Sequence, residues 1–156
     1  MIYRAPMRHA DGTGAVAHAL RHGVVGLPGA LSPAPATLDD ALAATPDERA
    51  ARRLERFAHV PAGAFVWTRD GDGLYRLGRL TGGPWRYDAS PAAGAAGLHH
   101  VRPAEWLDRP FGDDAVPAAV AATFARGGRN FQRTHDALAE RQTAALWDDA
   151  TASTTR

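Results

Sequence analysis

Aromatic side chains interleaved with arginine are the residues of this sequence best suited to chemistry. They gather in its central part, where the aromatic positions are Trp67, Tyr75, Trp85, Tyr87 and Trp106 and the basic positions are Arg69, Arg76, Arg79, Arg86 and Arg102. Because every nucleobase has a π-face, an aromatic wall with arginine at its rim is typical of a site that holds a base. Trp106 is expected in the core, and Trp67 either in the core or in such a pocket. Trp85 and Tyr87 follow Gly82-Gly83-Pro84, a segment expected to leave the sheet, so their rings either line a site or pack locally.

Several other chemistries are excluded by what the sequence lacks. It has no cysteine, so a zinc ribbon, an iron–sulfur site and a cysteine nucleophile are ruled out. All 18 basic residues are arginine, so there is no lysine for a Schiff base or a phosphate loop. The three serines lie in Pro/Ala-rich loops or in the tail, outside any Gly-x-Ser-x-Gly motif. His99 and His100 are adjacent and would point to opposite faces of a strand. We therefore expect no metal, no cofactor and no catalytic residue.

Charge and hydropathy place only loose limits on the partners. The 156 residues include 18 basic and 17 acidic ones, and this net charge of +1 does not by itself indicate a nucleic-acid or membrane partner. No apolar run approaches the roughly 18–20 residues that a membrane-spanning helix needs. Residues 1–7 lack the apolar stretch of a signal peptide. We expect a cytoplasmic protein that does not engage a membrane.

The order of strand-like and helix-like patterns predicts an α+β fold. Apolar alternation bounded by turn residues predicts strands over residues 1–7, 23–29, 63–69, 74–82 and 98–107. Amphipathic spacing and capping residues predict helices over residues 13–22, 37–44, 45–58, a segment between 112 and 126, and a last one starting at Asn130. Asp70-Gly71-Asp72-Gly73 predicts a hairpin turn, and residues 90–97 a loop of small residues. Hairpin-linked strands with helices before and after fit a small antiparallel barrel or curved sheet, and the missing crossover helices argue against a doubly wound sheet.

A second group of arginines follows the strand region. Residues 126–133 read Arg126-Gly-Gly-Arg129-Asn130-Phe131-Gln132-Arg133. Three arginines around a Gly-Gly break either hold a backbone phosphate, with Asn130 and Gln132 adding hydrogen bonds, or support the end of the preceding helix. The last helix is expected to turn Phe131, Leu138, Ala145 and Leu146 inward.

On the predicted helix 45–58, a stripe of four arginines is either a solvated face or a phosphate contact: Arg49, Arg52, Arg53 and Arg56.

The order of several short motifs resembles the PUA-like superfamily, in particular its EVE and YTH-like branch. The motifs are an opening Ile2-Tyr3-Arg4-Ala5, then Gly-Val-Val-Gly-Leu ending at Leu27, Pro-x-Gly at 61–63, Tyr-x-Leu-Gly-Arg-Leu-Thr-Gly at 75–82, Trp-x-Tyr-Asp at 85–88 and His-x-Arg-Pro-x-x-Trp-Leu at 100–107. The resemblance covers residues 1–108. It implies a PUA-like domain there, a helical extension over 109–150 packed on it, and a frayed tail over 151–156.

This resemblance implies a reader that holds one flipped, modified base, such as 5-methylcytosine or N6-methyladenine, in an aromatic cage. Carried over by position, Trp85, Tyr87 and Asp88 form one side of the pocket, with Asp88 accepting from a base amino group. Val25 and Leu27 lie at the other side, and either Trp67 or Tyr3 has to complete the cage, because this chain has Leu27-Pro28 where many relatives carry a tryptophan. The residues expected to contact the nucleic-acid backbone are Arg86, Arg126, Arg129, Asn130 and Arg133.

Four functions therefore remain open. The first is a non-catalytic reader of modified DNA that acts with a separate nuclease in a defence or restriction system. In the second, the same pocket reads RNA. The third is a ribonuclease of the ASCH type, in which His99, His100 or His135 serves as acid or base because the chain has no lysine. The fourth is a protein-interaction adaptor whose pocket has lost its ligand.

Overall fold

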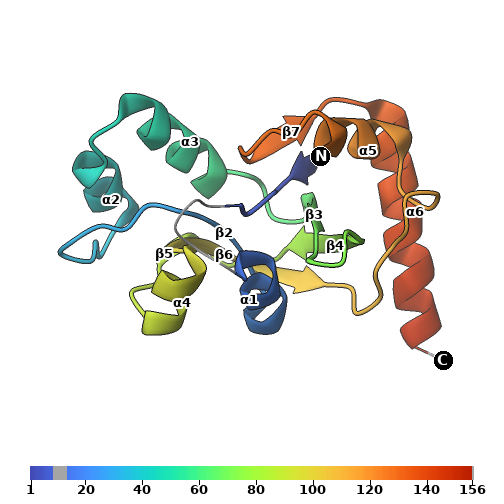
Figure 1. Ribbon diagram of the computed structural model, residues 1–156, viewed down its shortest axis with the longest axis horizontal. Helices are drawn as coiled ribbons and strands as arrows, with labels where there is room; N and C mark the ends of the chain where they lie inside the picture. Colours follow the sequence, from blue (N-terminus) through green and yellow to red (C-terminus); the bar gives the residue numbers. More distant parts are fainter. Residues whose placement is uncertain (9–13, 156) are drawn as a thin grey trace.

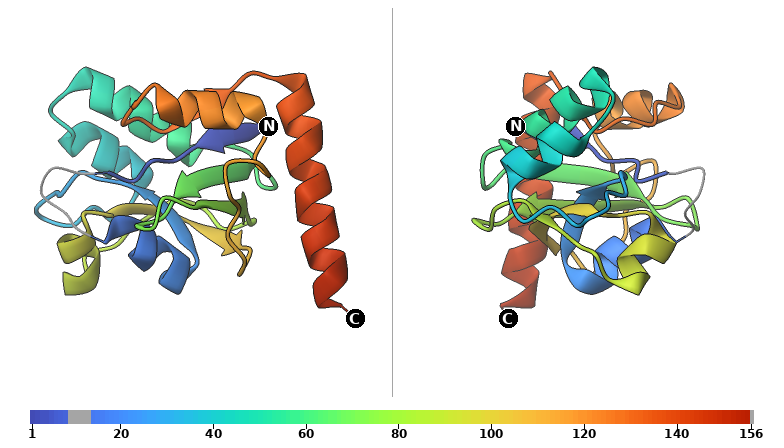
Figure 2. Two further views of the ribbon diagram at one scale, coloured as in Figure 1. Left: turned by 45° about the vertical axis from the view of Figure 1, so that its right-hand side comes forward. Right: turned by 90° about the vertical axis from the view of Figure 1, so that its left-hand side faces the viewer.

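Seven short strands, within the residues that the structure describes (1–8 and 14–155), form one curved sheet in the order β2-β6-β4-β3-β1-β7, with β5 beside β6. In this computed structural model the strands are β1 (Ile2–Arg4), β2 (Val24–Leu27), β3 (Phe65–Arg69), β4 (Tyr75–Leu80), β5 (Arg86–Tyr87), β6 (His100–Trp106) and β7 (Gln132–Thr134). The helices that flank the sheet are α1 (Ala15–His22), α2 (Leu38–Ala44), α3 (Glu48–Ala58), α4 (Pro91–Ala96), α5 (Ala118–Ala125) and α6 (Ala137–Thr154) (Figure 1; Figure 2). The predicted α+β class with a curved, helix-flanked sheet is confirmed.

The sheet is mixed, whereas the sequence predicted an antiparallel one. β3 and β4 form the expected hairpin, and the Asp70 carboxylate accepts hydrogen bonds from the Asp72 and Leu74 amides, both at 3.0 Å, inside its turn. β1, however, pairs parallel to β3. The long connection between them, which carries α1, β2, α2 and α3, is what permits a parallel pair. β7 then pairs antiparallel to the free edge of β1, so the segment after residue 108 contributes to the sheet as well as to the helices.

Local capping explains where the N-terminal helices begin. Thr37 Oγ1 accepts a hydrogen bond from the Asp40 amide at 3.1 Å, as the sequence predicted for α2. α3 is capped by Asp47, which accepts from the Arg49 amide at 2.9 Å, so it begins two residues later than the predicted Thr45 cap. The predicted helix 13–22 is α1, which starts at Ala15; Thr13 lies outside the described residues.

Residues 90–97 form a helix, not the predicted loop. Ser90 caps α4 by accepting from the Ala93 amide at 3.2 Å, and Pro91 occupies the first turn, where its missing N–H is harmless. Gly97 ends the helix in the left-handed conformation, with φ of 71°. The buried Ala93 and Ala96 explain why the segment is so poor in large apolar residues, because only small side chains fit where α4 packs closely on the rest of the molecule.

The last helix also differs from its prediction. Asp136, not Asn130, caps α6, because β7 occupies the intervening residues. Leu138 is 55% exposed and Ala145 is exposed, whereas Ala139, Thr143 and Trp147 face inward. α6 continues through Thr154, so the predicted frayed tail is helical up to that residue, and Arg156 lies outside the described part of the chain.

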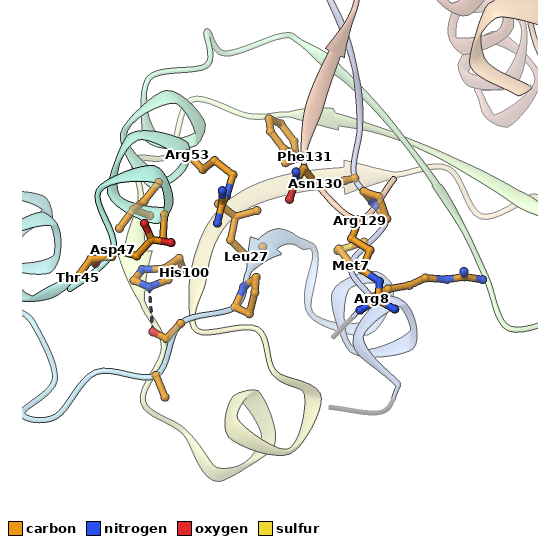
Figure 3. Close-up of a pocket in the computed structure, with 18 of the residues that line it drawn as sticks. Met7, Arg8, Leu27, Thr45, Asp47, Arg53, His100, Arg129, Asn130 and Phe131 are labelled. Carbon is orange, nitrogen blue, oxygen red and sulfur yellow. Dashed lines mark hydrogen bonds between the residues drawn. The ribbon is translucent and has the colours of Figure 1, made fainter. Parts of the chain in front are cut away.

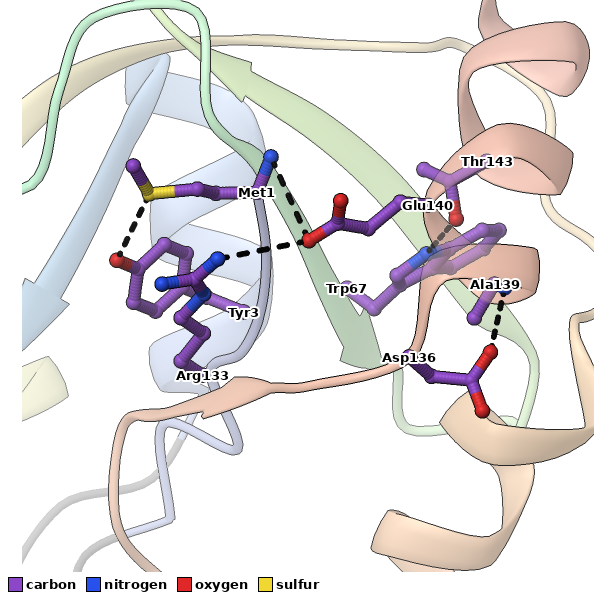
Figure 4. A network of polar contacts seen from close by, with 8 residues as sticks. All are labelled: Met1, Tyr3, Trp67, Arg133, Asp136, Ala139, Glu140 and Thr143. Atoms are coloured by element: carbon purple, nitrogen blue, oxygen red, sulfur yellow. Dashed lines mark hydrogen bonds and ion pairs between the residues drawn. The ribbon is translucent and has the colours of Figure 1, made fainter.

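Two apolar cores lie on opposite faces of the sheet, because alternate residues of a strand point to opposite sides. Val66 belongs to the core under α1 and α3, while its neighbour Trp67 belongs to the core under α5 and α6. Trp67 is 1% exposed, and its indole N–H donates to Thr143 Oγ1 at 3.1 Å (Figure 4). The suggestion that Trp67 completes a base pocket is therefore wrong. Val25, which has no exposed surface, is likewise a core residue.

A buried arginine joins α3 to the sheet. Arg102 of β6 is 5% exposed, and its Nη1 donates to the carbonyls of Phe57 and Val60 at the C-terminal end of α3. The Phe57 carbonyl otherwise accepts only from backbone amides of the helix end, the Val60 amide at 3.4 Å among them, and Val60 lies just beyond the helix, so a guanidinium is well suited to bond both carbonyls. Among the described residues, no helix is both long and apolar enough to cross a membrane.

Candidate functional site

The curvature of the sheet brings together four segments that are far apart in the sequence and leaves a cavity of about 360 Å³ between them (Figure 3). The segments are the chain just after β1, the end of β2 with the loop that follows, the start of α3, and the residues before β7. Known small-molecule sites enclose about 300–1,000 Å³, so the cavity, here called the main pocket, suits a ligand at the small end of that range.

The floor of the main pocket is apolar. Ala5, Met7 and Leu54 are buried there, and Leu27 and Phe131 are partly buried. Phe131 is held in place by stacking on Tyr3, with ring centroids 4.9 Å apart. The backbone of Met7 is in the left-handed region with φ of 49°, a conformation that is uncommon for residues with a side chain and is concentrated at functional sites. Of the predicted base-pocket residues, only Leu27 lines this cavity.

His100 forms one wall of the main pocket and is locked in a single protonation state. Its Nε2 lies 3.0 Å from the Gly29 carbonyl oxygen (Figure 3), and the indole N–H of Trp85 donates to its Nδ1 at 3.2 Å. Because the indole N–H can only donate, Nδ1 must be unprotonated and Nε2 must carry the hydrogen. Burial lowers the pKa of His100, and the hydrogen bond to Gly29 raises it. The effect of burial is larger, and the resulting pKa is about 4. His100 is therefore neutral at physiological pH, with both ring nitrogens occupied.

Trp85 and Tyr87, which were predicted to form an aromatic cage, contact residues that line the main pocket but do not line it themselves. Trp85 stacks on His100 with ring centroids 5.9 Å apart, and Tyr87 contacts the edge of the same imidazole. The Tyr87 hydroxyl accepts from the Leu31 amide at 2.8 Å and donates to the Leu31 carbonyl at 3.2 Å, which fixes the loop after β2. Neither ring lines the main pocket. The expectation that Trp85 and Tyr87 stack on the ligand is wrong for this cavity, because they instead position His100 and Leu31, which do line it.

Asp88 and Arg86 also lie away from the main pocket, contrary to their predicted roles. Asp88 accepts from the Ser90 amide at 2.9 Å and pairs with Arg86 at 3.7 Å. Burial works to raise the pKa of Asp88, but the Ser90 hydrogen bonds and the charges of Arg86 and His18 outweigh it and hold the pKa below its usual value. This carboxylate and its arginine satisfy each other and the start of α4.

The rim of the main pocket is basic. Arg8 follows β1, Arg53 extends from α3 toward the cavity, and Arg129 precedes β7 (Figure 3). Within the described residues, none of these three arginines belongs to an ion pair. Asp47 is the carboxylate among the described residues that line the pocket, and one of its oxygens accepts the hydrogen bond that caps α3. Three guanidinium groups around an apolar floor are suited to an anionic ligand with a flat, weakly polar body.

The segment that carries Arg129, Asn130 and Phe131 is held by a buried arginine, Arg4, which is 4% exposed. Arg4 Nη1 donates to the Thr123 carbonyl at 2.7 Å and to its hydroxyl at 2.9 Å, at the end of α5. Arg4 Nη2 donates to the Asn130 carbonyl at 3.3 Å and to Gln132 Oε1 at 3.0 Å. Gly128 lies flat against this guanidinium, and a Cβ there would overlap it. Burial, and next the charge of Arg126, lower the pKa of Arg4.

The five predicted backbone-contacting residues therefore separate into two groups. Arg129 and Asn130 line the main pocket. Arg133 instead lies over Tyr3 and pairs with Glu140 at 3.8 Å (Figure 4), Arg86 pairs with Asp88, and Arg126 lies near Arg4. Among the described residues, the side chain that bonds the end of α5 is Arg4 and not an arginine of residues 126–133, and the phosphate clamp, of which Arg129 lines the cavity, stays a prediction.

The histidines do not assemble a metal or acid–base centre in the part of the chain that is described. The rings of His18 and His22 lie side by side on α1, tilted by 37° with centroids 4.3 Å apart, but no group of three possible ligands among the described residues could hold a metal ion. His100 is the only described histidine that lines the main pocket. With its Nδ1 accepting and its Nε2 donating, it has no free nitrogen with which to move a proton.

The neutral state of His100 predicts a specific pH dependence of stability. The unfolded imidazole binds a proton below about pH 6.5, whereas the folded one stays neutral down to about pH 4, so acid favours the unfolded state between these values. We expect the free energy of unfolding to fall by up to about 3 kcal/mol more across this window than in His100→Gln. Urea unfolding of both proteins at several pH values measures the difference, and parallel curves would contradict the neutral assignment.

Comparison with known proteins found no matching family model, curated protein or solved structure. The resemblance to the PUA-like superfamily therefore stays a prediction.

Proposed function

We propose that this protein binds nucleic acid and holds one extruded nucleobase in the main pocket. The observation that carries the proposal is the set of three arginines that form no ion pair with any described residue and surround an apolar cavity of base-compatible size. An extruded base is flat and weakly polar, and its phosphates lie at its edge, which matches an apolar floor with a guanidinium rim. Releasing a base from its stack costs a few kcal/mol, which burial in such a pocket offsets.

The ligand we propose is DNA with a modified base. The apolar floor formed by Met7, Leu27 and Leu54 favours an added methyl group over a water-filled gap. Asn130 uses its carbonyl to accept from Arg4, and no hydrogen bond to a described residue engages its side-chain amide, so the amide is free to read a base edge. Asp47, at the rim, takes over the role first predicted for Asp88, acceptance from a base amino group.

A non-catalytic role fits this site better than a ribonuclease. His100 is neutral and fully hydrogen-bonded, and no other described histidine lines the pocket. We propose a cytoplasmic reader that marks modified DNA for a separate nuclease in a defence system. An RNA reader is the alternative, and competition between matched DNA and RNA strands separates the two, because only RNA offers 2′-hydroxyl contacts.

Fluorescence anisotropy tests this function directly. We expect tenfold or greater preference, about 1.4 kcal/mol, for a strand with 5-methylcytosine or N6-methyladenine over its unmodified counterpart. The panel contains single-stranded and duplex DNA and RNA at two salt concentrations. Salt-sensitive binding without preference would reduce the protein to a general nucleic-acid binder, and absence of binding at low salt would overturn the proposal in favour of an adaptor.

Substitution at the rim gives the matching test of residues. Arg53→Gln and Arg129→Gln should weaken binding to all strands and reduce the slope of log K against log salt by about 0.7–0.9 each, the value expected for one lost phosphate contact. Arg133→Gln is the control, because this arginine pairs with Glu140 away from the main pocket. Equal losses in all three variants would contradict the assignment of the rim.

A further inference from the structure

A second hollow, of about 590 Å³, adjoins the main pocket. It lies between the chain after β1, the first turn of α1 and the β3–β4 turn, and four residues line both cavities: Pro6, Met7, Arg8 and Arg129. Arg8 and Arg129 therefore stand on a ridge with the main pocket on one side and this hollow on the other. A ligand that fills the main pocket and extends past them enters the second hollow.

The side chains that line the second hollow are suited to bind a negatively charged group. Arg69 lines it and is held in place, because its Nε and Nη2 both donate to the Gly73 carbonyl, at 3.2 and 2.9 Å, and its guanidinium covers the Tyr75 ring at 4.9 Å. These contacts leave Nη1 available to a ligand. An arginine fixed in this way loses little conformational entropy when it binds phosphate.

Asp70, the carboxylate among the described residues that line the hollow, already has partners for both of its oxygens. Asp70 Oδ1 accepts two amide hydrogen bonds in the hairpin turn, and Oδ2 pairs with Arg76 at 3.6 Å. The first turn of α1 contributes no acidic side chain. Among the described residues, the lining of the hollow therefore combines three guanidinium groups with one neutralised carboxylate, which favours an anion over a cation or an apolar group.

From this arrangement we propose that the second hollow is a phosphate site for the nucleotide next to the extruded one. The inference rests on the proposed function and adds to it the class of ligand, a continuous strand with at least one flanking phosphodiester. Arg8 and Arg129 bind the phosphate of the extruded nucleotide from the ridge, and Arg69 binds the next phosphate along the strand. A free mononucleotide, by contrast, reaches only the main pocket and the ridge.

The chain offers a closely matched control for Arg69. Arg79 also lies on the β3–β4 hairpin, donates to a glycine carbonyl (Gly63, 3.3 Å) and covers an aromatic ring (Phe65, 5.3 Å). It lines neither cavity. Arg69→Gln and Arg79→Gln remove similar structural contacts, so a difference between them reports on ligand binding and not on folding.

Calorimetric titration with two sizes of DNA ligand tests the inference. The probes are the 5′-monophosphates of 5-methyldeoxycytidine and N6-methyldeoxyadenosine, and five-nucleotide strands with the same base at the centre. We expect the wild type to bind the strands at least tenfold more tightly than the monophosphates. Arg69→Gln should lose most of this gain and about 0.7 of the salt slope, while its affinity for monophosphates stays unchanged. Arg79→Gln should behave as wild type with both.

The outcomes separate this inference from the function on which it rests. If Arg69→Gln binds the strands as tightly as wild type, while Arg53→Gln weakens them, the phosphate site is wrong and the main pocket stands. If Arg69→Gln weakens strands and monophosphates equally, the two hollows are not distinct subsites. If the wild type binds neither kind of ligand, both the proposed function and this inference are overturned.

Discussion

Trp67→Ala is expected to lower the free energy of unfolding by about 3–5 kcal/mol, the usual cost of removing a large buried aromatic side chain. Trp67 contacts Tyr75 and Phe111 edge-to-face in the core beneath α5 and α6, and its indole N–H donates to Thr143 on α6. The substitution leaves a cavity between sheet and helix and an unsatisfied hydroxyl. Urea unfolding followed by circular dichroism measures the loss.

Trp67→Phe serves as the graded control. It keeps most of the packing and loses the hydrogen bond to Thr143, worth about 1 kcal/mol, so its destabilisation should be clearly smaller. Both variants, studied where they are fully folded, should bind nucleic acid as the wild type does. If the Trp67→Ala protein keeps its stability and loses only base selectivity, Trp67 contributes to the ligand pocket. That result would contradict its assignment to the core.

Arg4→Met is expected to affect stability and binding together. Methionine preserves the packing of the side-chain stem but supplies no donor, so the Thr123 and Asn130 carbonyls and Gln132 Oε1 lose their partners. Since a buried acceptor left unpaired costs about 1–3 kcal/mol, we expect a net loss of about 2–4 kcal/mol in the free energy of unfolding. The segment that presents Arg129 and Asn130 to the pocket should lose its fixed position, and affinity should fall at least tenfold.

Arg102→Met is the matched control for Arg4→Met. Arg102 is also a buried arginine bonded to carbonyls at a helix end, but its partners, Phe57 and Val60, do not line the main pocket. It should lose comparable stability and much less affinity. Gly128→Ala should disturb the same hydrogen bonds of Arg4, because the added Cβ displaces the Arg4 guanidinium. Unchanged affinity in folded Arg4→Met would show that the segment keeps its position without this arginine.

Local sequence signals were enough to predict most of the elements. The Asp-Gly turn predicted the β3–β4 hairpin, and Thr37 predicted the start of α2. α4 was missed because six small residues carry no amphipathic pattern, and only its Ser-Pro start and Gly97 end mark it as a helix. The parallel pairing of β1 with β3 could not be predicted, because no local pattern records which strands become neighbours after a long connection.

The site was harder to predict than the fold. Trp85 and Tyr87 were predicted to line the site, but residue type alone could not show that they instead hydrogen-bond to His100 and Leu31, which line the main pocket. Arg53 belongs to a stripe of four arginines on α3, and the sequence does not show which of the four faces a cavity. Arg8 was overlooked because its position at the pocket depends on the turn of the chain after β1, where Met7 adopts a positive φ.

The position of β1 between β3 and β7 also constrains the order in which the chain can fold during its synthesis. Ile2 pairs with Thr134 across most of the chain, so one edge of β1 stays open until residue 134 has left the ribosome. An open edge is a template for unwanted pairing with other chains, and closing so long a loop is slow compared with forming the β3–β4 hairpin. Because Arg129 and Asn130 immediately precede β7, the candidate site stays incomplete until these residues have been synthesised and β7 has paired with β1.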